Sequence, residues 1–137
     1  MKILLALTDA SNLEIIRPIP LPEEYELNSV SDGIELLIAM QENPDLVIVD
    51  VNLPEINGYE CCRLIKHDEK NRHTSVILLM PTQDLVAWTR LSDCGADDFL
   101  QHPIPPHVVK SKIQLLLRLS KLRQQLSQQA LRNKIQD

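Results

Sequence analysis

Leu46-Val47-Ile48-Val49-Asp50 is an apolar run that ends abruptly on a carboxylate. A short unbroken run of valine, isoleucine and leucine is typical of a parallel strand that is buried on both faces. In open α/β sheets, ligands bind outside the carboxyl ends of such strands. The run therefore predicts a central strand that carries Asp50 to the functional edge of a sheet and presents its carboxylate to solvent.

Strand and helix patterns alternate outward from this run. Strand patterns occur at 3–7, 25–30, 46–49, 76–80 and 98–101, and helical patterns follow each of them. Such alternation favours an α/β fold with a parallel sheet covered by helices on both faces and with right-handed crossovers. The prolines at 18, 20 and 22 confine the first helix to about 10–17, because a proline inside a helix removes a hydrogen bond and clashes with the preceding turn.

Two helices begin with a capping pattern. Asp32 precedes Glu35, and Asn57 precedes Glu60, each by three residues, which is the spacing of a capping box. We expect each of these helices to bury an apolar face in the core. The expected core residues are Ile34, Leu37 and Ile38 in the first helix, and Cys61, Leu64 and Ile65 in the second.

The C-terminal segment 107–137 contains no glycine or proline and predicts one helix longer than a small domain can cover. We divide the chain into a domain at 1–120 and a projecting helix at 121–137. The projecting helix is a dimer strut, a connector to an output domain outside these residues, or a frayed tail. Its apolar seam has the 4, 3, 4 spacing of a short coiled coil and consists of Leu115, Leu119, Leu122 and Leu126.

Composition narrows the classes of protein to which the chain can belong. The chain has 137 residues, of which 44% are hydrophobic and 24% charged, as in ordinary globular domains. No apolar run approaches the roughly 20 residues of a membrane helix, and Cys61, Cys62 and Cys94 fit no zinc spacing. We expect a cytoplasmic protein with reduced thiols and no membrane partner. The basic segment 110–137 lacks aromatic residues and alternates charges with leucine and glutamine, which favours a solvated helix face over direct nucleic-acid binding.

Several stretches, taken together, resemble the receiver domain of bacterial two-component response regulators over residues 1 to about 120. The resemblance implies a five-stranded sheet of flavodoxin-like order 2-1-3-4-5 and a phosphorelay signalling function. It implies that Asp50 accepts a phosphoryl group from a histidine kinase or phosphotransfer protein. The stretches that carry it are Ile3–Asp9, Asp32–Glu35, Pro44–Asp50, Pro54–Gly58 and Gly95–Leu100 with Pro103.

The same resemblance implies a bound Mg²⁺. A carboxylate is a poor nucleophile, so such a site needs a metal to spread charge on the phosphoryl oxygens. Mg²⁺ prefers oxygen ligands and keeps several waters. The implied ligands are the carboxylate of Asp50, the backbone carbonyl of Asn52 and, directly or through water, the carboxylate of Asp9.

The chain departs from the family pattern at several positions. Receivers carry two or three acids after the first strand, where this chain has Leu7-Thr8-Asp9. The family threonine or serine after the fourth strand is Met80 here, with Thr82 two residues later, and the family lysine is His102. Phe99 occupies the position of the switch aromatic on the fifth strand. A histidine is charged only in part near neutral pH, so these departures imply weakened phosphoryl and Mg²⁺ binding.

Three functions remain open. The first is a phosphoacceptor module at Asp50, and the second is a pseudo-receiver that acts as an interaction or dimerisation platform, including a homodimer through the C-terminal helix. The third is a flavin- or nucleotide-binding enzyme of similar fold. The chain has only three glycines, and none forms a phosphate-binding cluster after the first strand. We therefore predict a protein that is not an enzyme.

Overall fold

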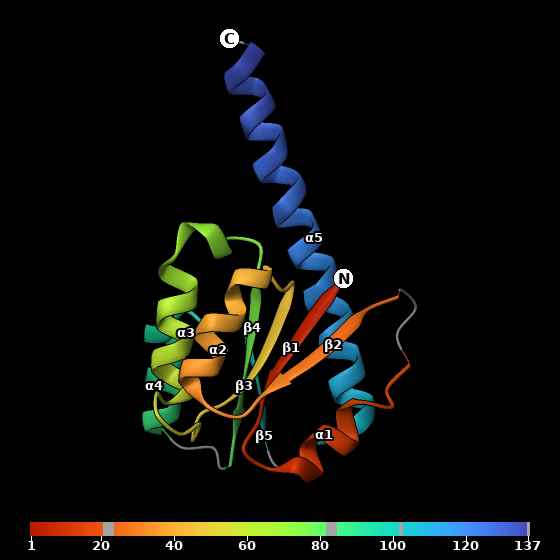
Figure 1. The fold of residues 1–137 in the computed structure, drawn as a ribbon, viewed down its shortest axis with the longest axis vertical. Helices are drawn as coiled ribbons and strands as arrows, with labels where there is room; N and C mark the ends of the chain where they lie inside the picture. The colour runs from red at the N-terminus through yellow and green to blue at the C-terminus, as the bar shows by residue number, and fades with distance from the viewer. Residues whose placement is uncertain (21–23, 82–84, 102, 137) are drawn as a thin grey trace.

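Strands and helices alternate throughout the computed structural model, which describes residues 1–20, 24–81, 85–101 and 103–136 (Figure 1). The strands are β1 (Lys2–Ala6), β2 (Glu26–Val30), β3 (Leu46–Asp50), β4 (Ser75–Met80) and β5 (Asp98–Gln101). The α-helices are α1 (Ala10–Ile16), α2 (Gly33–Ala39), α3 (Gly58–His67), α4 (Leu85–Cys94) and α5 (Pro106–Gln136), with short 3₁₀ helices η1 (Met40–Glu42) and η2 (Glu69–Asn71).

The strands form one parallel sheet. Within the described residues, five strands lie in the order β2-β1-β3-β4-β5, which confirms the predicted fold class and strand order. Strand β3 lies at the centre and pairs with β1 and β4, and all of its residues are buried. Because successive side chains of a strand point to opposite faces, Val47 and Val49 pack on one side while Leu46 and Ile48 pack on the other. This two-sided burial explains the unbroken apolar run.

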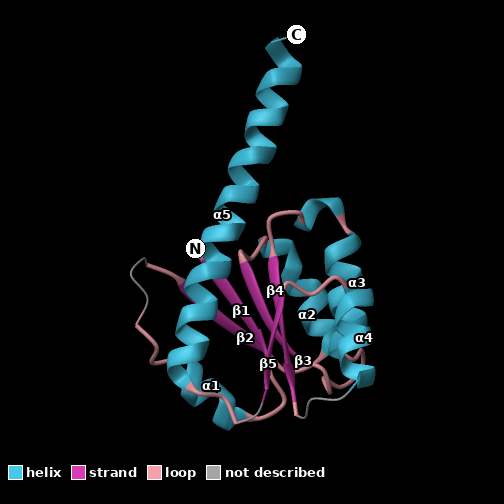
Figure 2. Cartoon of the chain, turned by 180° about the vertical axis from the view of Figure 1, so that it is seen from behind, coloured by secondary structure: helices cyan, strands magenta, loops and turns pink. Residues whose placement is uncertain are grey.

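Helices cover both faces of the sheet (Figures 1 and 2). Helices α2, α3 and α4 contribute Leu36, Cys62 and Leu91 to the core on one face. Helices α1 and α5 contribute Ile16 and Ile113, among others, to the core on the opposite face. The chain is therefore a three-layered α/β domain with an apolar core on each side of the sheet.

The expected core faces of α2 and α3 are partly wrong. In α2, Ile34 and Ile38 are 48% and 62% exposed, whereas Leu36 is fully buried and Leu37 is half-buried. The helix is rotated so that Leu36 and Met40, one turn apart, face the sheet. In α3, Leu64 is 40% exposed and Cys62 is buried in its stead. The buried face of α3 therefore consists of Cys61, Cys62 and Ile65, with Gly58 at its start.

Helix α5 runs antiparallel to the strands and leaves the domain at the edge opposite to that where β3 ends (Figure 1). Its buried residues end at Ser120, and Leu126 is 70% exposed beyond that point. Although α5 has 31 residues, no helix in the described part of the chain is apolar enough to cross a membrane.

A buried carboxylate ties α5 to the domain before it projects. The side chain of Asp97, only 9% exposed, accepts hydrogen bonds from Lys66 Nζ at 2.9 Å, Arg123 Nη2 at 2.8 Å and the Val76 N–H at 2.8 Å. Burial alone would raise the pKa of Asp97, but the bonds from Arg123, Val76 and Lys66 outweigh it and hold that pKa below its ordinary value. Asp97 therefore joins α3, β4 and α5 through one ionised group.

A pair of buried hydroxyls reinforces this attachment. The Oγ atoms of Ser75 and Ser120 are 2.7 Å apart, and Ser120 Oγ also donates to the carbonyl of Asp45 at 2.8 Å. Ser75 Oγ donates to the Leu116 carbonyl of α5 at 3.2 Å. These bonds satisfy polar groups that would otherwise be buried without partners, and they fix the last covered turn of α5 against β4.

We expect Asp97→Asn to lower the free energy of unfolding by about 2–3 kcal/mol near neutral pH, because the change leaves Lys66 and Arg123 partly buried without a counter-charge. The folded-state pKa of Asp97 is lowered, so its ionised form stabilises the fold fully above the unfolded pKa of about 3.9 and ceases to do so as pH falls through the folded value. Urea denaturation should show the difference from wild type shrinking below about pH 4.

The matched control is Glu69→Gln, which removes an exposed ion pair with Arg72 at 3.2 Å. It should change the free energy of unfolding little, since exposed pairs contribute little. An Asp97→Asn protein as stable as wild type near neutral pH would contradict the anchoring role of Asp97.

Candidate functional site

Asp50 is the last residue of β3 and lies at the carboxyl edge of the sheet. The expectation that its carboxylate faces solvent is wrong, because Asp50 is only 5% exposed. Both carboxylate oxygens accept hydrogen bonds: Oδ1 from the Asn52 N–H at 2.9 Å and Oδ2 from Thr8 Oγ1 at 2.7 Å. The carboxylate is therefore covered by the loops that follow β1 and β3, and it is stabilised there by polar donors.

Thr8 is the side chain that meets Asp50. Strands β1 and β3 are paired in the register Ala6↔Val49, so the chain that follows Ala6 runs beside Asp50. Leu7 is buried in the core, and Thr8 directs its hydroxyl to Asp50 Oδ2. The sequence marks Thr8 only as a replacement for an acid. The register of β1 against β3 in the structure identifies Thr8 as a hydrogen-bond partner of Asp50.

Asp9 has a different position from Thr8. It is the N-cap of α1, with extended backbone angles of −111° and 118°, and its Oδ1 accepts the Ser11 N–H at 2.9 Å. Aspartate is a favoured N-cap because its oxygen satisfies a backbone donor of the first turn. The side chain is exposed. Its role as a metal ligand stays a prediction.

The loop from β3 to α3 is held close to the backbone of Asp50. Gly58 donates its N–H to the Val51 carbonyl at 3.1 Å, and a Cβ at Gly58 would lie 2.2 Å from the Asp50 carbonyl oxygen. On the other side, Gly33 of α2 donates to the Pro54 carbonyl at 2.9 Å. Only a residue without a side chain permits the approach at Gly58. The loop that presents Asn52 is thus clamped between α2 and α3.

The expected switch positions differ in their surroundings. Met80 is 1% exposed and packs in the core shared with α2, α3 and α4. Phe99 is half-buried; the ammonium of Lys112 lies 5.0 Å from its ring centroid and donates to its carbonyl at 2.8 Å. Phe99 is therefore in contact with α5, which carries Lys112. Thr82 and His102 lie outside the described residues.

The contacts at Asp50 bring its carboxylate together with the Thr8 hydroxyl and the Asn52 N–H. The Asn52 carbonyl and the Asp9 carboxylate are further oxygens of the same two loops. Oxygen ligands suit Mg²⁺, but Asp50 already accepts two hydrogen bonds. Within the residues that the structure describes, no group of three His, Cys, Asp or Glu side chains could hold a metal ion. The donor set therefore fits a largely hydrated Mg²⁺.

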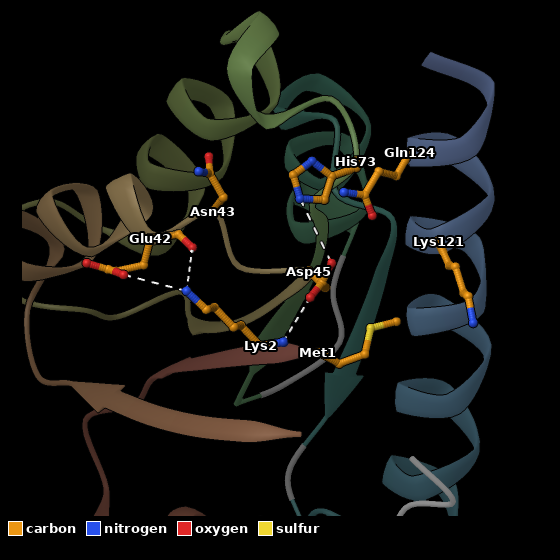
Figure 3. Close-up of a pocket in the computed structure, with 8 residues that line it drawn as sticks. All are labelled: Met1, Lys2, Glu42, Asn43, Asp45, His73, Lys121 and Gln124. Carbon is orange, nitrogen blue, oxygen red and sulfur yellow. Dashed lines mark hydrogen bonds and ion pairs between the residues drawn. The ribbon is translucent and has the colours of Figure 1, made fainter. Parts of the chain in front are cut away.

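A surface pocket lies at the opposite edge of the sheet, where α5 leaves the domain (Figure 3). Lys2 Nζ is 3.6 Å from Glu42 Oε2, and the Lys2 N–H donates to Asp45 Oδ2 at 2.8 Å. His73 Nε2 lies 3.9 Å from Asp45 Oδ1. The Lys2 ammonium thus pairs with Glu42 and the Lys2 N–H with Asp45. The pocket is lined by Met1, Lys2, Glu42, Asn43, Asp45, His73, Lys121 and Gln124.

Comparison with known proteins identifies the family of this α/β domain. The sequence profile of the response regulator receiver domain matches residues 3–114. The chain belongs to this family. Receiver domains are signalling modules of two-component systems, and they interact with histidine kinases or phosphotransfer proteins. The identification of the chain as a receiver domain is thereby confirmed.

Relatives and solved structures agree with this assignment. The DNA-binding response regulator MtrA of Mycobacterium tuberculosis (strain ATCC 25618 / H37Rv) is 30% identical over 118 residues, which cover 85% of this chain and 50% of MtrA. The chain thus spans about half the length of that relative. A signal receiver domain of a histidine kinase from Syntrophus aciditrophicus is 33% identical, with a TM-score of 0.76 over 85% of this receiver domain and 89% of that chain.

A third comparison concerns the fold alone. The receiver domain of a sensor histidine kinase from Pseudomonas aeruginosa PAO1 is 22% identical, with a TM-score of 0.73 over 85% of this chain and 96% of that one. That protein has a magnesium ion coordinated in its active-site cleft. The likeness supports the receiver fold of this chain.

We expect Thr8→Val to lower the free energy of unfolding by about 1–2 kcal/mol, because it removes the donor to a buried carboxylate oxygen. Thr8→Ser keeps the hydroxyl and should stay close to wild type. Urea denaturation measures both. In an Asp50→Ala background the cost of Thr8→Val should largely disappear; an equal cost in both backgrounds would show that the hydrogen bond is not its cause.

Proposed function

We propose that Asp50 is the phosphoacceptor of this receiver domain and that its site binds phosphoryl and Mg²⁺ more weakly than an ordinary receiver site. The support is the position of Asp50 at the carboxyl end of the central strand, with a clamped loop beside it. The observation that carries the proposal of weak binding is the hydrogen bond of 2.7 Å from Thr8 Oγ1 to Asp50 Oδ2. A neutral hydroxyl there supplies no negative charge for a cation.

The proposed transfer begins with attack by an Asp50 oxygen on the phosphorus of a phosphohistidine. The P–N bond breaks, and the imidazole, which already carries a proton on its other ring nitrogen, leaves as the neutral base. The attacking oxygen must give up its bond from Thr8 or Asn52, and the freed Thr8 hydroxyl can then donate to a phosphoryl oxygen. Bound through Asp50, the Asn52 carbonyl and Asp9, Mg²⁺ would supply charge neutralisation on the phosphoryl group.

Two further positions weaken the proposed phosphorylated state. Met80 offers no hydroxyl to the phosphoryl group, and His102 offers a positive charge to a phosphate only when protonated. Each charge-assisted hydrogen bond is worth roughly 1.5–3 kcal/mol, so the loss of either donor lowers the population of the switched state about tenfold or more. Phe99, held by Lys112, would have to leave its present contacts to follow a switch.

A phosphorylation-independent interaction platform is the second candidate. The buried Met80 and the two hydrogen bonds on Asp50 favour it, because the site is already satisfied without a phosphoryl group. The exposed leucines of α5 also favour it. In this case the domain would bind a partner protein or a second copy of itself through its surface. Substitution of Asp50 would then leave this binding unchanged.

Intact mass spectrometry after incubation with acetyl phosphate and Mg²⁺ separates the two candidates. We expect an adduct of about 80 Da, the mass of one phosphoryl group, in wild type and none in Asp50→Asn. Thr8→Asp should raise the yield and the Mg²⁺ affinity, because it places a second carboxylate beside Asp50. Asp9→Asn keeps an N-cap, so a drop in yield in this variant would support Asp9 as a metal ligand.

Absence of the adduct from both wild type and Thr8→Asp, at every Mg²⁺ concentration, would favour the platform. An adduct that persists in Asp50→Asn would place the phosphorylation elsewhere. Circular dichroism of each variant controls for misfolding.

We further propose that α5 pairs with α5 of a second copy. Three seam residues, Leu115, Leu122 and Leu126, are 59%, 50% and 70% exposed, and their heptad spacing suits a two-stranded coiled coil. The remainder of α5 also fits a connector to an output domain. The two roles are compatible, because paired helices also fix the distance between the two copies of a domain that follows them.

We expect Leu122→Glu with Leu126→Glu to shift the protein towards monomer in analytical ultracentrifugation, because like charges would meet in the seam. Leu131→Glu is the matched control: Leu131 is 59% exposed but lies about 140° around the helix from Leu126. A wild-type chain that stays monomeric at high concentration, or an equal effect of Leu131→Glu, would contradict pairing through this seam.

A further inference from the structure

Two thiols meet between α3 and α4. Cys62 of α3 is fully buried, and Cys94, the last residue of α4, is 4% exposed. Cys62 Sγ lies 3.5 Å from the carbonyl oxygen of Cys94, and Cys94 Sγ lies 3.4 Å from the carbonyl oxygen of Leu91. Residues 32 apart in the sequence are thus brought together by the packing of two helices.

Contacts on either side of this thiol pair hold α3 to α4 and to the loop that follows α4. Towards the start of α3, the guanidinium of Arg90 lies 5.1 Å from the ring centroid of Tyr59. Towards its end, Lys66 Nζ is 2.9 Å from Asp97 Oδ2. A disulfide forms without strain only where the backbones are already close, and these two contacts keep the segments that carry the thiols packed together.

The end of α4 approaches α3 closely. Gly95 follows Cys94 with a positive φ of 80°, and a Cβ built there would lie 3.5 Å from Lys66 Cβ. A glycine in this left-handed conformation ends the helix. The chain beside Cys94 therefore passes against α3, within van der Waals distance of Lys66.

The contact also makes the two thiols chemically unequal. The neighbouring Cys62 side chain favours the thiolate of Cys94 and lowers its pKa to about 7. The same contact, together with burial, raises the pKa of Cys62. Because the thiolate is the reactive form, Cys94 is the nucleophile of the pair and Cys62 is the partner that captures the oxidised product.

We propose that Cys62 and Cys94 are a redox modification site, which closes to an intramolecular disulfide when the protein meets a hydroperoxide. The Cys94 thiolate attacks the terminal oxygen of the hydroperoxide, the O–O bond breaks, and the alkoxide leaves and takes up a proton. Cys62 sulfur then attacks Cys94 Sγ, the S–O bond of the sulfenic acid breaks, and water leaves. The protein loses two hydrogens in all, the hydroperoxide is reduced to alcohol and water, and a dithiol restores the thiols.

The disulfide would change how α4 is held. It adds a covalent bond between α3 and the end of α4, in the middle of the seam that Tyr59–Arg90 and Lys66–Asp97 now hold through weaker contacts. Cross-linking constrains the unfolded chain, so the oxidised form should melt at a higher temperature. The proposal does not depend on phosphorylation of Asp50, which lies in a different part of the fold.

The test treats the purified, folded chain with hydrogen peroxide, quenches it, and alkylates it with N-ethylmaleimide in denaturant before intact-mass measurement. Of the three thiols in the chain, oxidised wild type should keep one that alkylates, and dithiothreitol should restore all of them. Cys62→Ala and Cys94→Ala should form no disulfide. The melting temperature of oxidised wild type should rise by about 5 °C.

Cys61→Ala is the matched control. Cys61 is as buried as its neighbour, but its Sγ contacts the carbonyls of Gly33 and Ile56 at 3.9 and 3.5 Å, and burial raises its pKa to about 11. The oxidised Cys61→Ala chain should take up no alkyl group, because both remaining thiols are in the disulfide.

Tandem mass spectrometry of the cross-linked peptide from wild type identifies the paired residues even where an alanine variant fails to fold. A Cys62–Cys94 link supports the proposal. Full alkylation of peroxide-treated wild type, oxidation to sulfinic acid without a cross-link, or a link through Cys61 would each overturn it.

Discussion

A carboxylate that is buried at the end of a central strand must find hydrogen-bond donors, and the site of this receiver domain is arranged around that requirement. Asp50 finds them in the Thr8 hydroxyl and the Asn52 N–H, which come from the loops after β1 and β3. The loops can reach it because Gly58 lets the start of α3 pass directly over the Asp50 carbonyl. Asp97, near the other edge, meets the same requirement with two cations. Asp50 is therefore held by neutral donors, whereas two cations make Asp97 a structural anchor.

The architecture was predictable because the strongest patterns belong to elements whose surroundings are uniform. Strand β3 is buried on both faces, so its unbroken apolar run indicates a buried strand and nothing else. The apolar run of β4 indicates a buried strand for the same reason. Helix α2 was harder, because apolar residues occur around most of its circumference. Ile34 and Ile38 are exposed while Leu36 is buried, and spacing alone does not say which of two apolar stripes faces the sheet.

The position of Asp50 was predictable, because it ends a recognisable strand, but the residues that contact it were less so. A one-residue change in where β1 ends decides whether Thr8 or Asp9 meets Asp50, and strand ends are poorly marked by composition. The cap formed by Asp9 has a local signal, since it directly precedes α1. The contact between Cys62 and Cys94 has none, because it depends on how two helices pack across 32 residues of chain.

The direction of α5 has a mechanical consequence. The helix departs from the edge farthest from Asp50, and the segment from Ser120 to Gln136 extends for about 24 Å beyond its last buried turn. A rigid helix of that reach works as a lever arm whose pivot is the cluster around Asp97. A tilt of about 5° at the pivot would carry the tip through about 2 Å, as much as a small helix shift at an interface in known switches. Displacements too slight to alter the core are in this way amplified at the far end of the molecule.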